Sequence, residues 1–374
     1  SYMGPVDGHD VEALTQSLQW AREQRCPVLL HVRTVKGKGY SPAEERPADY
    51  HGVSPFDPVT GKPLRTAKMD FSHVFGQELT ALAGEDGRVC AITAAMQEGT
   101  GLTEFARKYP DRLFDVGIAE GHAVSMAGGM AKQGLVPVFA VYSSFLQRGY
   151  DQLLQDVALD GLHVVLGVDR AGLVGADGET HHGCFDALYL SQVPHMTVLC
   201  PASFAELRQM LRRAVLELTG PVAVRYPRGG EGAYQDCCGN ETFTQVRPGA
   251  DCTILTYGVL INEALAAAEL LHEAGVETRV VKLNAIAPLD GNAVLAALGS
   301  EKRLLVLEDC VGSGCVGQRL TAILAQRGRM PERLILKNLG DTIPCHGTVP
   351  QLYAQCGLDA ASVAAALKEA CHEQ

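Results

Sequence analysis

The chain has 374 residues, 43 of them acidic and 32 basic, so its formal net charge is −11 at pH 7. This acidic balance argues against a nucleic-acid or anionic-membrane surface, because a protein that binds a polyanion needs a basic footprint. Hydrophobic residues make up 47% of the chain, as in a globular protein with a core, but no apolar run reaches the roughly 18 residues of a transmembrane helix.

The length suits two or three domains. Short apolar runs alternate with amphipathic segments almost throughout, which predicts a parallel α/β architecture. The first segment reads as a helix over residues 11–24 and a strand over 27–34. Residues 36–68 are rich in Pro, Gly and charge. So long a segment without periodicity indicates a functional loop or a linker.

The α/β pattern restarts with a helix over residues 71–83, and a capping box at Ser203 and Glu206 predicts a helix to residue 218. The stretch 229–248 is polar and is expected to be a loop. A further α/β unit follows it. The predicted strands are 89–93, 113–116, 136–142, 164–169, 197–199, 222–226, 253–256, 278–283, 304–307 and 334–336.

Twelve cysteines occur, but none forms a CxxC pair that could build a zinc site. Most lie in apolar runs, for example Cys90 and Cys200, where a thiol packs as a small hydrophobe. We therefore expect reduced, structural cysteines and no metal site. No signal-peptide pattern opens the chain, and together these features predict a cytoplasmic protein.

Residues 115–122 place Glu120 just past an apolar strand, where a helix begins. Ligands of parallel α/β sheets bind at the carboxyl ends of strands. Because Ile118, Ala119 and Val124 are apolar, the Glu120 carboxyl group should be desolvated, and such a group can share a proton with a ring nitrogen. The alternative is a first-turn glutamate that complements the helix dipole.

Two further segments follow predicted strands. Residues 142–148 carry Phe145, which could stack on a planar heterocycle or belong to the core. Residues 169–183 form a glycine-rich loop with a cation, carboxylates and two histidines. Glycines let such a loop approach a ligand closely, although a surface turn is the alternative.

Two arginines lie near the end of the strand at 222–226. Strand alternation places Arg225 on a different face from Tyr226, so the two arginines need not act together. Arg228 lies beyond the strand end and is the better candidate for binding a phosphate through its forked guanidinium group.

With these motifs the sequence resembles the 1-deoxy-D-xylulose-5-phosphate synthase family. The resemblance implies a transketolase-like α/β fold: a pyrimidine-binding parallel-sheet domain, a C-terminal α/β domain and a remnant of the N-terminal diphosphate-binding domain. The implied boundaries are 1–50 for the remnant, 51–69 for a linker, 70–236 and 247–374 for the two domains. The motifs that carry the resemblance are 4–10, 36–40, 117–120, 142–148, 169–181, 226–229, 288–290, 346–347 and 357–359.

The resemblance also implies a reaction. Members of the family condense pyruvate with D-glyceraldehyde 3-phosphate and release carbon dioxide, using thiamine diphosphate and Mg²⁺. The product feeds isoprenoid, thiamine and pyridoxal synthesis. A homodimer is expected, and neither nucleic acid nor a membrane is an expected partner.

Residue roles are implied by the matching motifs. Glu120 would hydrogen-bond the aminopyrimidine ring, Phe145 would stack on it, Ile118 would support the bent cofactor, and Tyr40 would contact the cofactor. The implied catalytic residues are Glu120, His181 and His51, and the acceptor-binding residues are Tyr142, Arg170, Asp177 and Arg228.

The chain also departs from the family. Gly121 stands where the family usually has Gln, and no Gly-Asp-Gly motif for diphosphate and metal occurs. The Mg²⁺ ligands are therefore expected in an absent N-terminal part, and activity is expected to need a complementing N-terminal polypeptide. Two alternatives stay open. One is the C-terminal subunit of a transketolase or the beta chain of a 2-oxo acid dehydrogenase, and the other is a non-catalytic fragment.

Overall fold

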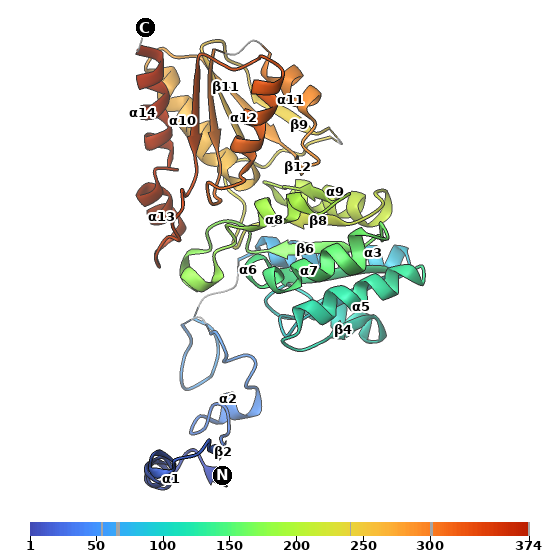
Figure 1. Cartoon of the computed structure of the whole chain (residues 1–374), viewed down its shortest axis with the longest axis vertical. Coiled ribbons are helices and arrows are strands. Elements are labelled where there is room, and N and C mark those ends of the chain that lie inside the picture. Colours follow the sequence, from blue (N-terminus) through green and yellow to red (C-terminus); the bar gives the residue numbers. More distant parts are fainter. Residues whose placement is uncertain (54, 65–67, 240, 300–301, 373–374) are drawn as a thin grey trace. The chain divides into compact units, whose positions relative to one another are not determined.

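In the computed structural model the apolar runs of the sequence become strands and the amphipathic segments become helices (Figure 1). The structure describes all residues except 54, 65–67, 240, 300–301 and 373–374. Contacts divide the chain into two units, Ser1–Lys68 and Met69–Gln374, and each is described by itself. No helix in the described residues is both long and apolar enough to cross a bilayer.

The first unit is a small α/β element. Strand β1 (Tyr2–Asp7) pairs in parallel with β2 (Leu29–Arg33), and α1 (Val11–Glu23) connects them. Asp10 caps α1 by accepting a hydrogen bond from the Ala13 N–H, as expected for an N-cap aspartate. The helix and β2 confirm the predicted pair. Strand β1 was not predicted, because the Gly and Pro within it are poor strand formers.

In its described residues, the segment predicted as a long loop contains one short helix, α2 (Ser41–Glu45). Around it, the rings of Tyr40, Tyr50 and Phe56 form a small aromatic cluster with centroids 5.3–5.9 Å apart. These edge-on and tilted contacts give the segment a local core.

The second unit contains a seven-stranded sheet with the order β12-β7-β8-β6-β5-β3-β4. Among its described strands all pairs are parallel except β12 with β7. The central strands are buried on both faces, which explains why their sequences are largely apolar rather than alternating. The strands are β3 (Val89–Thr93), β4 (Leu113–Asp115), β5 (Val136–Tyr142), β6 (Val165–Asp169), β7 (Thr197–Leu199), β8 (Val222–Arg225) and β12 (Ala285–Ala287).

Helices cover both faces of this sheet (Figure 1). Ala91 and Val138 share a core with α3 (Phe71–Glu85) and α9 (Phe204–Leu216). Alternate residues such as Ile92 and Phe139 pack with α5 (Glu120–Lys132) on the other face. The remaining helices of this part are α4 (Thr103–Lys108), α6 (Ser143–Leu146), α7 (Tyr150–Gln152), a π-helix (Leu153–Ala158) and α8 (Asp186–Gln192), with short 3-10 turns at Pro110–Arg112 and Gln147–Gly149.

A second sheet has the order β14-β13-β10-β11-β9. Helices α10 and α14 pack together on one side of it, and α11 and α12 lie on the other (Figure 1). The elements are β9 (Phe243–Arg247), β10 (Cys252–Tyr257), a 3-10 turn (Gly258–Leu260), α10 (Ile261–Glu273), β11 (Thr278–Leu283), α11 (Gly291–Leu298), β13 (Arg303–Leu307), α12 (Val316–Gln326), β14 (Arg333–Lys337), α13 (Val349–Cys356) and α14 (Ala360–His372).

Three details correct the sequence prediction. Strand β9 lies inside the stretch expected to be a loop and runs antiparallel to β11. Strand β12 follows β11 along the chain yet joins the seven-stranded sheet as its edge, which ties the two sheets together. The capping box is half formed: Ser203 Oγ accepts from the Glu206 N–H, but Glu206 accepts from the Ala202 N–H and pairs with Lys282.

The described cysteines are free thiols. Cys90 and Cys200 are buried in the core, as predicted, and burial raises the pKa of each, to about 11 and about 12. Thiols with such values are nearly all protonated at neutral pH and unreactive.

Candidate active site

The candidate site begins where β4 ends. The Asp115 carboxylate accepts hydrogen bonds from the backbone N–H groups of Ala95 and Gly117, at 2.8 and 2.9 Å. Gly117 has a positive φ of 70°, which glycine adopts without steric cost. This turn delivers Glu120 to the first position of α5, with only 3% of its side chain exposed. The carboxyl group is therefore buried, as its apolar sequence neighbours predicted.

Ile118 does not provide that burial, because it is 83% exposed. The expectation that Ile118 shields the carboxylate within this chain is therefore wrong: the turn directs its side chain outward. Val124, one turn further along α5, is fully buried as expected. The role of Ile118 in supporting a cofactor stays a prediction.

The carboxylate of Glu120 has a cationic partner. Arg148 Nη1 donates a hydrogen bond of 2.7 Å to Glu120 Oε1. The same guanidinium lies over the ring of Phe145, with Cζ 5.0 Å from the ring centre. Arg148 thus connects the start of α5 to the segment after β5, although 57% of its own side chain is exposed.

Three rings gather beside this pair. Phe145 is half-buried, and its centroid lies 5.5 Å from that of Tyr142 and 5.2 Å from that of His181. The neighbouring Leu146 is fully buried, so Leu146 rather than Phe145 fills the core here. His181 belongs to a 3-10 turn, Glu179–His181, in the glycine-rich loop. A partly exposed aromatic face is therefore available next to a histidine and a buried carboxylate.

Two guanidinium groups meet one carboxylate at the far side of these rings. Arg170 Cζ lies 3.7 Å from the centre of the Tyr142 ring, and Arg170 Nε donates to Asp177 Oδ2 at 3.1 Å. Arg228 Nε lies 3.0 Å from the same oxygen. The four residues implied as acceptor-binding, Tyr142, Arg170, Asp177 and Arg228, are thus brought together. Such paired, planar cations suit a phosphate group.

The end of β6 supports Arg170. Asp169 is fully buried; its Oδ2 accepts a 2.7 Å hydrogen bond from the Ser72 hydroxyl, and its Oδ1 lies 3.2 Å from Arg170 Nη1. Burial raises the pKa of the Asp169 carboxyl to about 6, against the opposing influence of the Arg170 charge. Burial also raises the pKa of the Tyr142 phenol. Asp169 was not among the residues singled out, since a strand-end aspartate is common and its partner Ser72 is distant in sequence.

The two adjacent histidines of the loop have different environments. His181 faces the rings described above, and its Nδ1 lies 2.8 Å from the Thr180 hydroxyl. His182 is buried, and its Nδ1 accepts from the Val174 N–H at 3.2 Å. Burial lowers the pKa of the His182 imidazole. His182 is therefore a structural residue, and His181 is the one that can meet a ligand.

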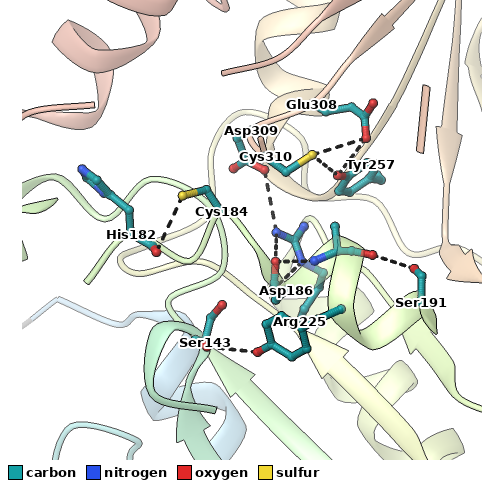
Figure 2. A network of polar contacts seen from close by, with 12 residues as sticks. Ser143, His182, Cys184, Asp186, Ser191, Arg225, Tyr257, Glu308, Asp309 and Cys310 are labelled. Atoms are coloured by element: carbon teal, nitrogen blue, oxygen red, sulfur yellow. Dashed lines mark hydrogen bonds and ion pairs between the residues drawn. The ribbon is translucent and has the colours of Figure 1, made fainter. Parts of the chain in front are cut away.

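Arg225 is separate from Arg228, as strand alternation predicted. It is buried and binds Asp186 through two hydrogen bonds, of 2.9 and 3.1 Å (Figure 2). Arg225 Nη2 also lies 3.8 Å from Asp309, and its Cζ lies 5.2 Å from the Tyr257 ring. Because Asp309 and Tyr257 belong to the second sheet's domain, this cluster is a link between the two domains.

Tyr40 and His51 belong to the first unit. The Tyr40 hydroxyl donates to the Pro58 carbonyl at 3.0 Å, and His51 Nδ1 lies 2.5 Å from Lys36 Nζ. The roles predicted for these two residues beside Glu120 stay predictions. In the described part of the chain, no group of three or more His, Cys, Asp or Glu side chains is arranged to hold a metal ion.

Comparisons with known proteins show the family of the chain. Residues 67–230 match the family model "Transketolase, pyrimidine binding domain", residues 242–363 match "Transketolase, C-terminal domain", and residues 1–34 match "1-deoxy-D-xylulose-5-phosphate synthase". The chain is 44% identical to the 1-deoxy-D-xylulose-5-phosphate synthase of Desulforudis audaxviator over 363 residues, which is 96% of this chain and 57% of that protein. The chain is a homologue of the 1-deoxy-D-xylulose-5-phosphate synthases.

A second 1-deoxy-D-xylulose-5-phosphate synthase, from Clostridium kluyveri, is 43% identical over 97% of this chain and 58% of its own length. The chain thus spans less than two thirds of the length of these relatives. A solved structure titled "Split gene transketolase, inactive beta4 tetramer" matches with a TM-score of 0.71 and 25% identity, over 80% of this chain and 97% of that chain. The resemblance and the transketolase-like fold predicted from the motifs are both confirmed.

Proposed function

We propose that the chain forms the pyrimidine-binding and C-terminal portion of a 1-deoxy-D-xylulose-5-phosphate synthase. The reaction would join pyruvate to D-glyceraldehyde 3-phosphate with release of carbon dioxide and yield a precursor of isoprenoids, thiamine and pyridoxal. One observation carries the proposal: a chain of contacts runs from Glu120 through Arg148 to Phe145. Phe145 and His181 both contact Tyr142, which lies against Arg170, and Asp177 joins Arg170 to Arg228.

The residues present fit the pyrimidine end of thiamine diphosphate. Glu120 offers a buried carboxylate, and Phe145 offers a half-exposed ring face. Nearby, the buried hydroxyls of Thr93, Ser143 and Ser144 have no hydrogen-bond partner within the described residues. Unpartnered buried hydroxyls at strand ends are expected where a polar ligand or water binds.

In this proposal Glu120 holds and returns a proton at a ring nitrogen of the pyrimidine, and Phe145 orients the ring by stacking. Thiamine diphosphate, when bound, supplies the carbon nucleophile and the electron sink that loss of carbon dioxide requires. The Glu120 carboxylate can serve this role because its burial excludes the water that would otherwise compete for the proton.

The acceptor would be bound at the other end of the set. Arg170 and Arg228 would take the phosphate of D-glyceraldehyde 3-phosphate through charge-assisted hydrogen bonds. Asp177, bound to both, would set the spacing between the two guanidinium groups. His181, with Nδ1 next to the Thr180 hydroxyl, presents Nε2 for proton transfer to the acceptor oxygen.

Mg²⁺ completes the proposed cofactor set, because it commonly bridges a diphosphate to protein oxygens. The contribution proposed for the residues of this chain is at the pyrimidine and acceptor, not at the metal. The expected homodimer, the complementing N-terminal polypeptide and the cytoplasmic location belong to the same proposal.

A reconstitution experiment tests it. The chain would be mixed with the N-terminal portion of a relative that carries Gly-Asp-Gly, together with thiamine diphosphate and Mg²⁺. We expect release of carbon dioxide from pyruvate that depends on D-glyceraldehyde 3-phosphate, and its loss in Glu120→Ala. If the two polypeptides associate and the mixture releases no carbon dioxide, the proposal is wrong.

A second candidate is the C-terminal subunit of another thiamine-diphosphate enzyme, such as a transketolase or a 2-oxo acid dehydrogenase. The observation that favours it is the match to 97% of the chain titled as a split-gene transketolase. Transfer of two carbons between sugar phosphates without carbon dioxide release would support the transketolase.

Calorimetry of the chain alone with thiamine diphosphate and Mg²⁺ is expected to give weak or no binding. A non-catalytic fragment would also fail to bind in the reconstituted mixture.

A further inference from the structure

The glycine-rich loop that carries Asp177 and His181 packs against the C-terminal domain. At its tip, Gly175 has a φ of 64°, and a Cβ built there would lie 3.1 Å from the Gly347 carbonyl oxygen and 3.2 Å from the Val349 nitrogen. The Val349 Cγ2 methyl group lies at the same 3.2 Å, so both backbone and side chain of the C-terminal domain face this glycine. Gly175 begins the 3-10 turn Gly175–Asp177, so this contact lies two residues from the carboxylate that binds both arginines.

The His346 side chain of the C-terminal domain also reaches this turn. His346 Nε2 lies 3.3 Å from the carbonyl oxygen of Ala176. A carbonyl oxygen only accepts, so the His346 Nε2–H must donate. The ring also covers Gly178, since His346 Cδ2 lies 3.4 Å from the position of a Cβ on that glycine. His346 is exposed and contacts the loop immediately before and after Asp177.

The two ends of the loop are held by the same domain. At the entry, a Cβ on Gly172 would lie 1.9 Å from Asp309 Oδ2, so only a glycine fits between the strand end and this carboxylate. Asp309 is in turn held near Arg225 (Figure 2). At the exit, the Val311 N–H donates to the Cys184 carbonyl at 3.0 Å.

We propose that His346 is a positioning residue for the acceptor site, with the C-terminal domain acting as the support for the loop of residues 172–184. The inference rests on the proposed function, because it assigns His346 to the site at which the phosphorylated acceptor would bind. The Asp177 carboxylate accepts from Arg170 and pairs with Arg228. A shift of Ala176 would move Asp177 and change the distance between the two guanidinium groups that face the phosphate.

Hydrogen–deuterium exchange of the chain tests whether His346 holds the loop in place, and it needs no substrate or cofactor. In His346→Ala we expect exchange of amides 176–181 to accelerate roughly fivefold, the factor expected for loss of one neutral hydrogen bond. His346→Gln should restore slow exchange, because a glutamine Nε2 can donate from nearly the same place. His272→Ala is the matched control: it removes another exposed histidine of this domain, one paired with Glu277.

A second variant acts on the same contact from the loop side. Gly175→Ala places a methyl group against Gly347 and Val349, at a φ of 64° that strains an alanine, so it should accelerate exchange of the same amides more strongly. Unchanged exchange in His346→Ala would overturn the role of His346, whatever Gly175→Ala does. Acceleration spread across the whole C-terminal domain, or equal in His272→Ala, would also overturn it.

The assembled enzyme gives a second readout. His346→Ala should raise the KM for D-glyceraldehyde 3-phosphate about threefold or more, with the KM for pyruvate and the kcat changed less than about twofold. Equal changes in both KM values would contradict a role confined to the acceptor site. The two claims can fail separately. If the mixture is inactive but His346→Ala still accelerates exchange of amides 176–181, the synthase proposal is wrong and the role of His346 in holding the loop remains.

Discussion

Arg148 donates a 2.7 Å hydrogen bond to Glu120, although the two residues lie 28 positions apart in the sequence. The donor is more than half exposed, and the acceptor is almost fully buried. The guanidinium also lies over the Phe145 ring. The Arg148 cation therefore contacts both residues that we propose to bind the pyrimidine. A bound pyrimidine ring would have to share this cation or displace it.

The first prediction concerns the Glu120 carboxylate. Glu120→Gln retains an oxygen that can accept from Arg148 but cannot exchange a proton with a ring nitrogen. We expect carbon dioxide release by the reconstituted enzyme to fall at least ~100-fold. The free energy of unfolding should change by only about 1 kcal/mol, because the hydrogen bond remains.

Glu104→Gln is the matched control for that change. Glu104 is also a first-turn glutamate, of helix α4, but it is exposed. It should leave both activity and stability unchanged, measured by carbon dioxide release and by urea denaturation. If Glu120→Gln kept most of the activity, a proton-transfer role for Glu120 would be wrong.

The second prediction separates the two arginines at the end of β8. Arg228→Ala should raise the KM for the phosphorylated acceptor about tenfold or more and change the free energy of unfolding by less than about 1 kcal/mol, since 40% of its side chain is exposed. Arg225→Ala should lower that free energy by about 3–5 kcal/mol, because it leaves Asp186 and Asp309 buried without their cation.

Urea denaturation and acceptor kinetics together check this pair. Arg225 has only 4% of its side chain exposed, so a tolerated Arg225→Ala would show that the interdomain cluster contributes little to stability. Equal loss of stability in both variants would contradict the assignment of Arg228 to ligand binding.

The third prediction is a pH dependence from Asp169. Burial raises the pKa of this carboxyl to about 6 from an ordinary value of 3.8. Between these values the folded chain binds a proton that the unfolded chain has lost, so the free energy of unfolding falls as pH rises from about 4 to about 6 and is level above that. The contribution of this group is of the order of 3 kcal/mol.

Asp169→Asn removes this titration and keeps an oxygen for the Ser72 hydroxyl. Urea denaturation at pH 4.5 and 7.5 should show a smaller decline for Asp169→Asn than for the unmodified chain. Asp111→Asn, at an exposed aspartate, should not alter the decline. Identical declines in the unmodified chain and Asp169→Asn would mean that Asp169 titrates normally.

The fourth prediction uses the contact between Gly99 and Tyr142. A Cβ on Gly99 would lie 1.8 Å from the Tyr142 hydroxyl oxygen, and Tyr142 is held by Arg170 and Phe145. Gly99→Ala should therefore lower the free energy of unfolding by about 1–3 kcal/mol. Adding Tyr142→Phe should recover part of the loss, because it removes the clashing oxygen. If the double variant is no more stable than Gly99→Ala alone, the clash with the Tyr142 hydroxyl is not the cause of the lost stability.

Most elements of the second unit could be predicted because their signals are local. The strands that end at Thr93, Tyr142 and Asp169 are continuous apolar runs, and the structure has them with nearly the predicted bounds. Their carboxyl ends carry the residues singled out, since parallel strands meet at one edge. Strand β12 was not predicted because it begins only two residues after β11 ends and its partner β7 lies far away in the chain.

The candidate site was predicted less completely than the fold. The motif containing Arg148 was recognised, but its bond to Glu120 depends on how the ends of β4 and β5 are brought together across β3. The burial of Arg225 depends on Asp309, 84 positions later in the numbering, and the contact of His346 with Ala176 spans 170 positions. No local pattern encodes such distances.

The amino-acid sequence by itself determined most of the strands and helices, the family and the residue types at the strand ends, because these depend on periodicity and short motifs. Only the tertiary structure decided which charges pair, that Glu120 is buried while Ile118 is exposed, and that the glycine-rich loop contacts the C-terminal domain. The physical reason is that burial and ion pairing depend on contacts between segments distant in sequence, and folding brings those segments together only when the two sheets are assembled.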